Sequence, residues 1–222
     1  MMRESDEVDE RIMDAALQRI LQVGIRRSSL DDIARRSGVN RVTIYRRFSG
    51  KDNLVEAVLS REIQRILAEA TVIATTASGV EAQIEETVLY ILRLTRTHPL
   101  VTQLIDVAPE EALSFYTVRG SDVVSLGVEY ITSILQAAQE RGEIESYDPV
   151  PVAELIARLA HSLLLTPAAG IDFGDVDAAR DFVRAAIVPL MLRGPGSAAT
   201  PGKRPRATTG IRRTRKKSGA ST

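Results

Sequence analysis

The 222-residue sequence predicts an all-α protein. Apolar residues recur at the three- and four-residue spacing of a helix face from one end of the chain to the other. No sustained run alternates apolar and polar residues as a half-buried strand does. Capping residues, glycine and proline stand between the apolar segments, where they start and stop helices.

The first 50 residues predict three helices. A helix over 7–23 carries one apolar stripe and is stopped by Gly24. Ser29 precedes an acidic first turn and caps a second helix, because a side-chain oxygen there accepts a bond from a free backbone N–H. Asn40 caps a short third helix in the same way, and Gly50 breaks it.

Further helices are predicted as far as residue 192. They are placed at 51–77, 80–97, 100–107, 110–117, 121–141, 149–166 and 176–192. Pro109 and Pro149 suit first turns, where a missing N–H costs nothing. Pro189 lies inside the last helix, so we expect it to kink that helix or to set its final turn apart.

The formal net charge of zero is a sum of unlike segments. Residues 1–24 hold 3 basic and 6 acidic side chains, 25–51 hold 8 and 2, 52–193 hold 10 and 21, and 194–222 hold 8 and none. Two basic segments therefore bracket an acidic body. A polyanion is expected to meet the first basic segment or the last.

Composition narrows the class of protein further. No apolar run approaches the roughly 18 residues that cross a bilayer, and the acidic start is unlike a signal peptide, so we expect a cytoplasmic protein. The absence of cysteine excludes disulfides and thiolate metal sites. Asp172, Asp175 and Asp177 lack the spacing of a calcium loop, and Asp175 or Asp177 is read as a helix cap. No metal and no cofactor is predicted.

The stretch SGVNRVTIYRRFSGKDNL, residues 37–54, carries the most specific chemistry. Two short helices joined by a tight turn at Gly38 form a helix-turn-helix, whose second helix enters the major groove of DNA. At its start, Asn40, Arg41 and Thr43 can meet base edges, and Val42 can meet a thymine methyl. The residues predicted to meet phosphates are Tyr45, Arg46, Arg47 and Lys51. On charge and caps alone, an ordinary basic surface helix remains the alternative.

The same residues resemble a known family. The positions are Ser29, Asp32-Ile33-Ala34, Ser37-Gly38-Val39-Asn40, Thr43-Ile44-Tyr45, Phe48, Lys51 and Leu54. Over roughly residues 10–58 this pattern resembles the DNA-binding domain of the TetR-family transcriptional regulators. The resemblance implies an all-α homodimer with a three-helix DNA-binding domain, and a larger helical domain that binds a small effector and dimerises through its last two helices.

The resemblance also implies roles for individual residues. It assigns phosphate contacts to Ser29, Thr43, Tyr45 and Lys51, and positions at or beside the groove to Asn40, Arg41, Val42 and Arg46. Two residues depart from the family's common choices: asparagine stands at 40 where serine is frequent, and valine stands at 42 where a smaller residue is frequent. Base preference is therefore not transferable from a relative.

The body is read from its residues alone. The helices at about 149–166 and 176–192 have apolar faces too broad for one contact, which predicts a four-helix interface in a homodimer. An interior helix of a monomer is the alternative. Polar or aromatic residues within apolar helices are candidate effector contacts, with ordinary core as the alternative for each. They are Tyr90, Arg93, Phe115, Tyr116, Tyr130 and His161.

The prediction is a ligand-responsive repressor that binds a near-palindromic double-stranded operator as a homodimer and is released by a small molecule. The expected domains are a disordered N-terminus (1–9), the helix-turn-helix domain (10–54), the effector and dimerisation domain (55–193), and a disordered basic tail (194–222) that adds phosphate contacts or solubility. One alternative is an architectural DNA-binding protein without an effector. A helical enzyme is the other, but the sequence offers it no nucleophile elbow or phosphate-binding glycine loop.

Overall fold

The computed structural model describes residues 2–118, 120–166 and 170–196, and these ranges contain helices and no strand. The all-α prediction is confirmed. The helices are α1 (Met2–Arg27), α2 (Leu30–Ser37), α3 (Arg41–Phe48), α4 (Lys51–Thr76), α5 (Val80–Thr97), α6 (Pro99–Val107), α7 (Pro109–Val118), α8 (Gly120–Glu140), α9 (Pro149–Leu165), α10 (Val176–Phe182), a π-helix (Val183–Ile187) and α11 (Val188–Arg193). The predicted basic tail lies outside the described residues from 197 onward.

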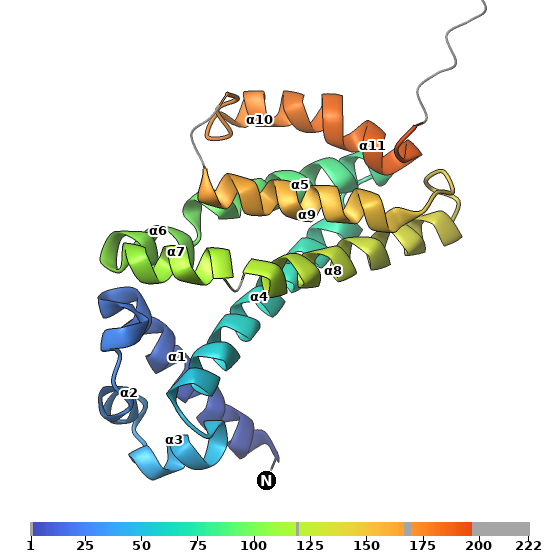
Figure 1. Ribbon diagram of the computed structural model, residues 1–222. Helices are drawn as coiled ribbons and strands as arrows, with labels where there is room; N and C mark the ends of the chain where they lie inside the picture. The colour runs from blue at the N-terminus through green and yellow to red at the C-terminus, as the bar shows by residue number, and fades with distance from the viewer. Residues whose placement is uncertain (1, 119, 167–169, 197–222) are drawn as a thin grey trace, which may run out of the picture.

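Helices α1, α2 and α3 form a small N-terminal module with the start of α4 (Figure 1). Its core is aliphatic and nearly sealed from water: Ile12 and Ala16 from α1 pack with Ile33 from α2, Ile44 from α3 and Val58 from α4. Burying several such side chains at about 1.5–3 kcal/mol each holds the short helices α2 and α3 at fixed angles to α1 and α4. The module can therefore present one face of α3 as a rigid surface.

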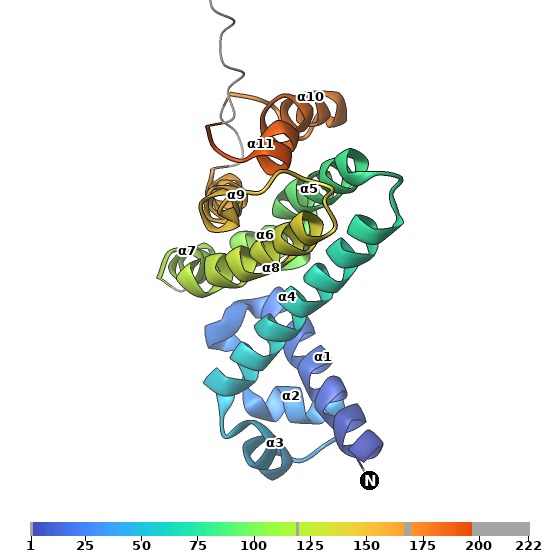
Figure 2. The ribbon, with the colours of Figure 1, turned by 90° about the vertical axis from the view of Figure 1, so that its right-hand side faces the viewer.

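The remaining helices form the body, which Figures 1 and 2 show stacked above the module with α4 crossing from one to the other. The body's main core joins α5, α8, α9 and the C-terminal helices, with Leu92, Leu135, Val152 and Val183 almost fully buried. Helices α8 and α9 pack closely along their length, and a Cβ added at Gly127 would meet the Ala157 Cβ at 3.3 Å. A glycine is suited to that close approach.

A separate apolar cluster joins the module to the body. Ile20 of α1 and Leu59 of α4 pack there with Leu104 of α6 and Tyr116 of α7. Gly24 lies at the same junction with φ 83° and ψ 168°, a conformation open essentially to glycine alone. It interrupts α1 as predicted, but the chain resumes a helical turn as far as Arg27, because Glu111 of α7 accepts the Arg26 N–H at 3.0 Å.

Two other boundaries differ from the sequence-based expectation. Helix α1 begins at Met2, so the segment 1–9 that was expected to be disordered is helical from Met2 onward. The predicted helix 176–192 is divided by the π-helix, and Pro189 stands in the first turn of α11, which confirms that proline sets the final turns apart. Of the two acidic candidates, Asp175 is the cap of α10, since it accepts the N–H groups of Asp177 and Ala178.

Candidate DNA interface and body cavity

The helix-turn-helix is set by local hydrogen bonds. The Ser29 hydroxyl oxygen accepts the Asp32 N–H at 3.1 Å, and the Asn40 carboxamide oxygen accepts the Thr43 N–H at 2.8 Å. Gly38 closes α2 in the left-handed conformation with φ 70°. Each cap satisfies a backbone group that the helix leaves unpaired, so the tight turn between α2 and α3 follows from residues within it.

One face of α3 is turned outward. Ile44 is fully buried in the module core and fixes the rotation of the helix. Arg41, Val42, Tyr45 and Arg46 are consequently exposed together, with Val42 73% exposed. A valine this exposed on a short helix has no packing role in the chain, and it is available to a thymine methyl.

Arg41 is oriented before any DNA arrives. Its guanidinium donates to a carboxylate oxygen of Asp31 at 3.1 Å and to the Tyr45 hydroxyl at 3.3 Å, and lies 5.4 Å from the Tyr45 ring centroid. The hydrogen bond with Tyr45 and the Asp31 charge raise the pKa of Arg41, so it stays cationic. Asp31 was not anticipated from the sequence. Its carboxylate compensates the charge of Arg41.

The other predicted contacts keep part of their bonding capacity. Thr43 donates its hydroxyl to Asn40 at 3.0 Å, which uses the Asn40 oxygen and leaves its amide N–H groups to donate. The Ser29 hydroxyl oxygen accepts a cap bond, which leaves its proton able to donate to a further acceptor. Lys51, at the first turn of α4, donates to the Arg26 carbonyl at 2.8 Å. Arg47 belongs to the module instead, because it is only 19% exposed and pairs with Asp9 at 2.7 Å.

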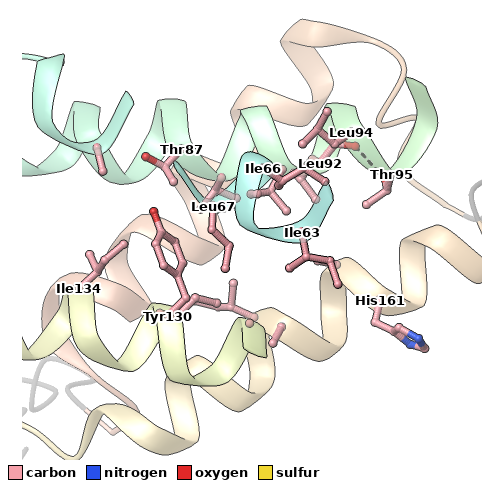
Figure 3. A pocket seen from close by; sticks show the side chains of 18 of the residues that line it. Ile63, Ile66, Leu67, Thr87, Leu92, Leu94, Thr95, Tyr130, Ile134 and His161 are labelled. Atoms are coloured by element: carbon pink, nitrogen blue, oxygen red, sulfur yellow. Dashed lines mark hydrogen bonds between the residues drawn. The ribbon is translucent and has the colours of Figure 1, made fainter. Parts of the chain in front are cut away.

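A cavity of about 460 Å³ lies in the body, between α4, α5, α7, α8 and α9 (Figure 3). Four of the predicted effector residues line it, namely Phe115, Tyr116, Tyr130 and His161. Two do not: Tyr90 and Arg93 lie on another face of α5. The Tyr90 hydroxyl donates to Glu69 at 2.7 Å, and the Arg93 guanidinium lies 5.8 Å from the Tyr90 ring.

Two of the lining residues hold the wall together. His161 shares a hydrogen bond of 2.9 Å with the Tyr116 carbonyl, and the Tyr116 hydroxyl donates to the Leu100 carbonyl at 2.7 Å. Burial raises the pKa of Tyr116, which keeps the phenol neutral. Polar groups of α4 and α5, such as Thr71 and Thr87, also line the cavity and were not predicted from the sequence. The feature that could have indicated them is the presence of threonine at helical spacing among the apolar residues of one helix face.

The charged groups at the cavity wall are compensated within the described part of the chain. Glu62 of α4 lies 3.3 Å from Arg61 and 3.0 Å from Arg65, and Arg141 pairs with Glu143 at 2.7 Å. Burial lowers the pKa of His98, so its imidazole is neutral near pH 7. The wall is otherwise mostly aliphatic. It suits a small molecule more than a reaction that needs a free acid, base or nucleophile.

An exposed recognition helix on a rigid module, joined to a helical body with a cavity, defines the class: a DNA-binding transcriptional regulator. Residues 12–58 match the family described as bacterial regulatory proteins, tetR family. An uncharacterized HTH-type transcriptional regulator of Mycobacterium bovis is 28% identical over 154 residues, which is 69% of this chain and 78% of that protein.

Solved structures show the same fold. A TetR-family regulator of Pectobacterium atrosepticum is 19% identical with a TM-score of 0.62, and the match covers 87% of this chain and 96% of that one. The TetR-family repressor AlkX of a Dietzia species is 20% identical with a TM-score of 0.61, over 82% and 94%. The N-terminal module thus matches the DNA-binding domain of the TetR family, the fold of the described residues resembles TetR-family structures, and the sequence relatives are transcriptional regulators. In the described ranges no helix has the length and apolarity needed to span a bilayer.

Proposed function

We propose that the chain is a cytoplasmic, ligand-responsive repressor that binds a near-palindromic operator as a homodimer and is released by a small-molecule effector. The observation that carries this proposal is the course of α4. Its first turn holds Lys51 beside the recognition helix, its next turns place Leu54 and Val58 in the module core, and its later turns, from Leu59 to Thr75, form a wall of the cavity.

On the DNA, two copies of α3 would lie in successive major grooves about one helical turn apart. Arg41, Val42 and Thr43 face the bases, together with the amide of Asn40. Ser29, Tyr45 and Lys51 face phosphates and fix the register, and Arg46 lies at the edge of the groove. The support for this arrangement is the common exposure of the α3 face and the caps that set it.

The dimer would form through α9 and the C-terminal helices. Leu155 on α9 is 57% exposed, and Val176 at the start of α10 is 65% exposed. Arg158 and Ser162 continue the exposed stripe of α9 at the spacing of one helix face. A large aliphatic side chain in the middle of such a stripe gains about 1.5–3 kcal/mol when a partner covers it.

Release would follow from the cavity's position. An effector that fits the cavity better in one arrangement of α4 favours that arrangement, and α4 carries the module with it. In the dimer, the two recognition helices would then no longer match successive grooves. The architectural alternative has no use for a cavity of about 460 Å³, which is within the size range of small-molecule sites. Two structural neighbours, AlkX and QsdR, are described as repressors.

The test is a selection of bound sequences from random DNA with the full chain, followed by sedimentation of the free protein and of its complex with the selected site. We expect a near-palindromic site with half-sites about one turn apart and a dimer in both states. Small molecules are then screened for release of the site. A monomer on a single half-site would refute the dimer, and a complex that no cavity ligand releases would favour the architectural alternative.

A further inference from the structure

The cavity is lined along much of the length of α4. Lining residues recur at helical spacing along α4, from Leu59 to Thr75, which corresponds to roughly 24 Å at 1.5 Å per residue. Leu59 and Glu62 are only 7% and 8% exposed, whereas Thr71 and Thr75 are exposed. The lining residues of α4 are therefore buried near the DNA-binding module and exposed near the turn between α4 and α5, and we call that second end of the cavity its open end.

Hydroxyl groups gather at the open end. The Tyr130 hydroxyl of α8 lies 2.9 Å from the Thr71 hydroxyl of α4. Thr87 lies at a similar level, since α4 and α5 form an antiparallel pair around the short turn at 77–79. In Figure 3, Thr87 and Tyr130 occupy one side of the cavity and His161 the other, with aliphatic side chains of α4 between them.

The protons of these hydroxyls can be assigned by counting. Thr71 donates its single proton to the Leu67 carbonyl at 2.8 Å, so Tyr130 must donate to Thr71. Burial raises the pKa of Tyr130, which keeps that proton on the phenol. The Thr87 hydroxyl oxygen is buried and has no hydrogen-bond partner among the described residues. A buried hydroxyl without a partner costs free energy that a ligand with one polar group can recover.

The other residues that line the cavity indicate the net charge and the apolar part of the ligand that it can accommodate. Glu62 and Arg141 already have ion-pair partners, so neither offers an uncompensated charge to a carboxylate or an ammonium group. Ile63, Ile66 and Leu67 provide aliphatic surface below the hydroxyls. Resting on the effector role proposed above, we propose that this cavity takes a neutral, elongated, mainly aliphatic molecule whose single hydrogen-bonding oxygen meets Thr87 at the open end.

The test measures binding without DNA, by isothermal titration calorimetry of the full chain with three nine-carbon probes: 1-nonanol, nonanoate and nonyltrimethylammonium. We expect 1-nonanol to bind most tightly. Thr87→Val keeps the side-chain shape and removes the hydroxyl. It is expected to lower the affinity for 1-nonanol by roughly two- to tenfold. Thr95→Val is the matched control, because Thr95 also lines the cavity but already donates to the Leu92 carbonyl at 2.7 Å.

Leu67→Phe narrows the aliphatic part of the cavity and is expected to lower the affinity for 1-nonanol. Circular dichroism checks that the variant remains folded. Tighter binding of either charged probe, or equal effects of Thr87→Val and Thr95→Val, would overturn the proposed ligand class. Failure of the effector role would give a different result. The binding of 1-nonanol would then respond to the substitutions as expected, but 1-nonanol would not release the protein from the selected operator. A charged molecule that releases the operator would leave the effector role intact and refute the ligand class.

Discussion

Replacing Gly24 by alanine tests the junction between the DNA-binding module and the body. Gly24 has φ 83° and ψ 168°, and an added Cβ would lie 2.7 Å from the Ala108 Cβ and 3.3 Å from the Glu111 carboxylate. Glu111 is the group that holds the last turn of α1 through the Arg26 N–H. The substitution therefore strains the backbone and pushes α1 away from the α6–α7 connection.

Two costs add in this variant. A non-glycine residue in this backbone region costs about 1–3 kcal/mol, and forcing a methyl group into a filled contact costs about 1–3 kcal/mol more. The unfolded chain of any Gly→Ala variant also loses entropy, which returns about 0.4–1 kcal/mol. The expected net loss is about 1–5.5 kcal/mol, a substantial part of the roughly 5–15 kcal/mol that stabilises a typical domain.

Gly142→Ala is the matched control. Gly142 also has a positive φ, 71°, but an added Cβ there meets nothing within 4 Å. Gly142→Ala is therefore expected to lose only the roughly 1–2 kcal/mol that a left-handed backbone conformation costs a non-glycine residue. Urea unfolding of both variants at one protein concentration, followed by circular dichroism, measures the difference. A Gly24→Ala loss no larger than that of Gly142→Ala would show that the contact with Ala108 does not hold the junction.

Other predictions concern the DNA interface and pH. Arg41→Ala should weaken binding to the selected operator by about 1–3 kcal/mol and leave binding to random DNA nearly unchanged. Lys51→Ala should weaken binding to both kinds of DNA equally, as measured by filter-binding titration. Arg47→Ala should lower stability to urea and leave the salt dependence of DNA binding unchanged, because its partner is Asp9. Hydrogen bonds from Arg184 and Arg180 lower the pKa of Glu85 below its usual value of 4.5, so its contribution to stability is full above that pH and is lost as the pH falls through the lowered pKa.

Each of these outcomes has a result that contradicts it. If Arg41→Ala lowers the affinity for operator and random DNA equally, Arg41 contacts a phosphate and not a base. A reduced salt slope for Arg47→Ala would show that the Asp9 pair opens on DNA. If the unfolding midpoints of Glu85→Gln equal those of the parent chain at every pH between about 3 and 6, the ion pairs of Glu85 with Arg180 and Arg184 do not stabilise the body.

The DNA-binding module could be predicted from the sequence because its determinants are local. The caps at Ser29 and Asn40 and the turn at Gly38 act within a few residues of themselves, so the spacing of the residue types was enough. The contact that the sequence did not predict there is the ion pair of Arg47. Its pairing with Asp9 depends on how α1 crosses α3, and a sequence pattern holds no information on that crossing.

The cavity was harder to predict because a wall is made by several helices at once. Tyr90 and Arg93 are polar residues in an apolar helix, as Tyr130 is, but the rotation of α5 against α4 and α8 turns them away from the cavity. That rotation is set by core side chains such as Val88 and Leu92. Thr87 was overlooked for the same reason, since only the packed structure shows that its hydroxyl is buried without a partner.

The connections across α1 and α4 limit how an effector can act. Arg61 of α4 is nearly buried and pairs with Glu10 and Asp14 of α1, each at 2.9 Å, and with Glu62 at the cavity wall. Separating α1 from α4 would remove two of the three carboxylates that pair with this nearly buried charge. A ligand that moved α4 would therefore carry α1 and the recognition helix with it as one body. The surface that would have to shift is the contact of α1 with α6 and α7, around Gly24 and the apolar cluster of Ile20 and Leu104.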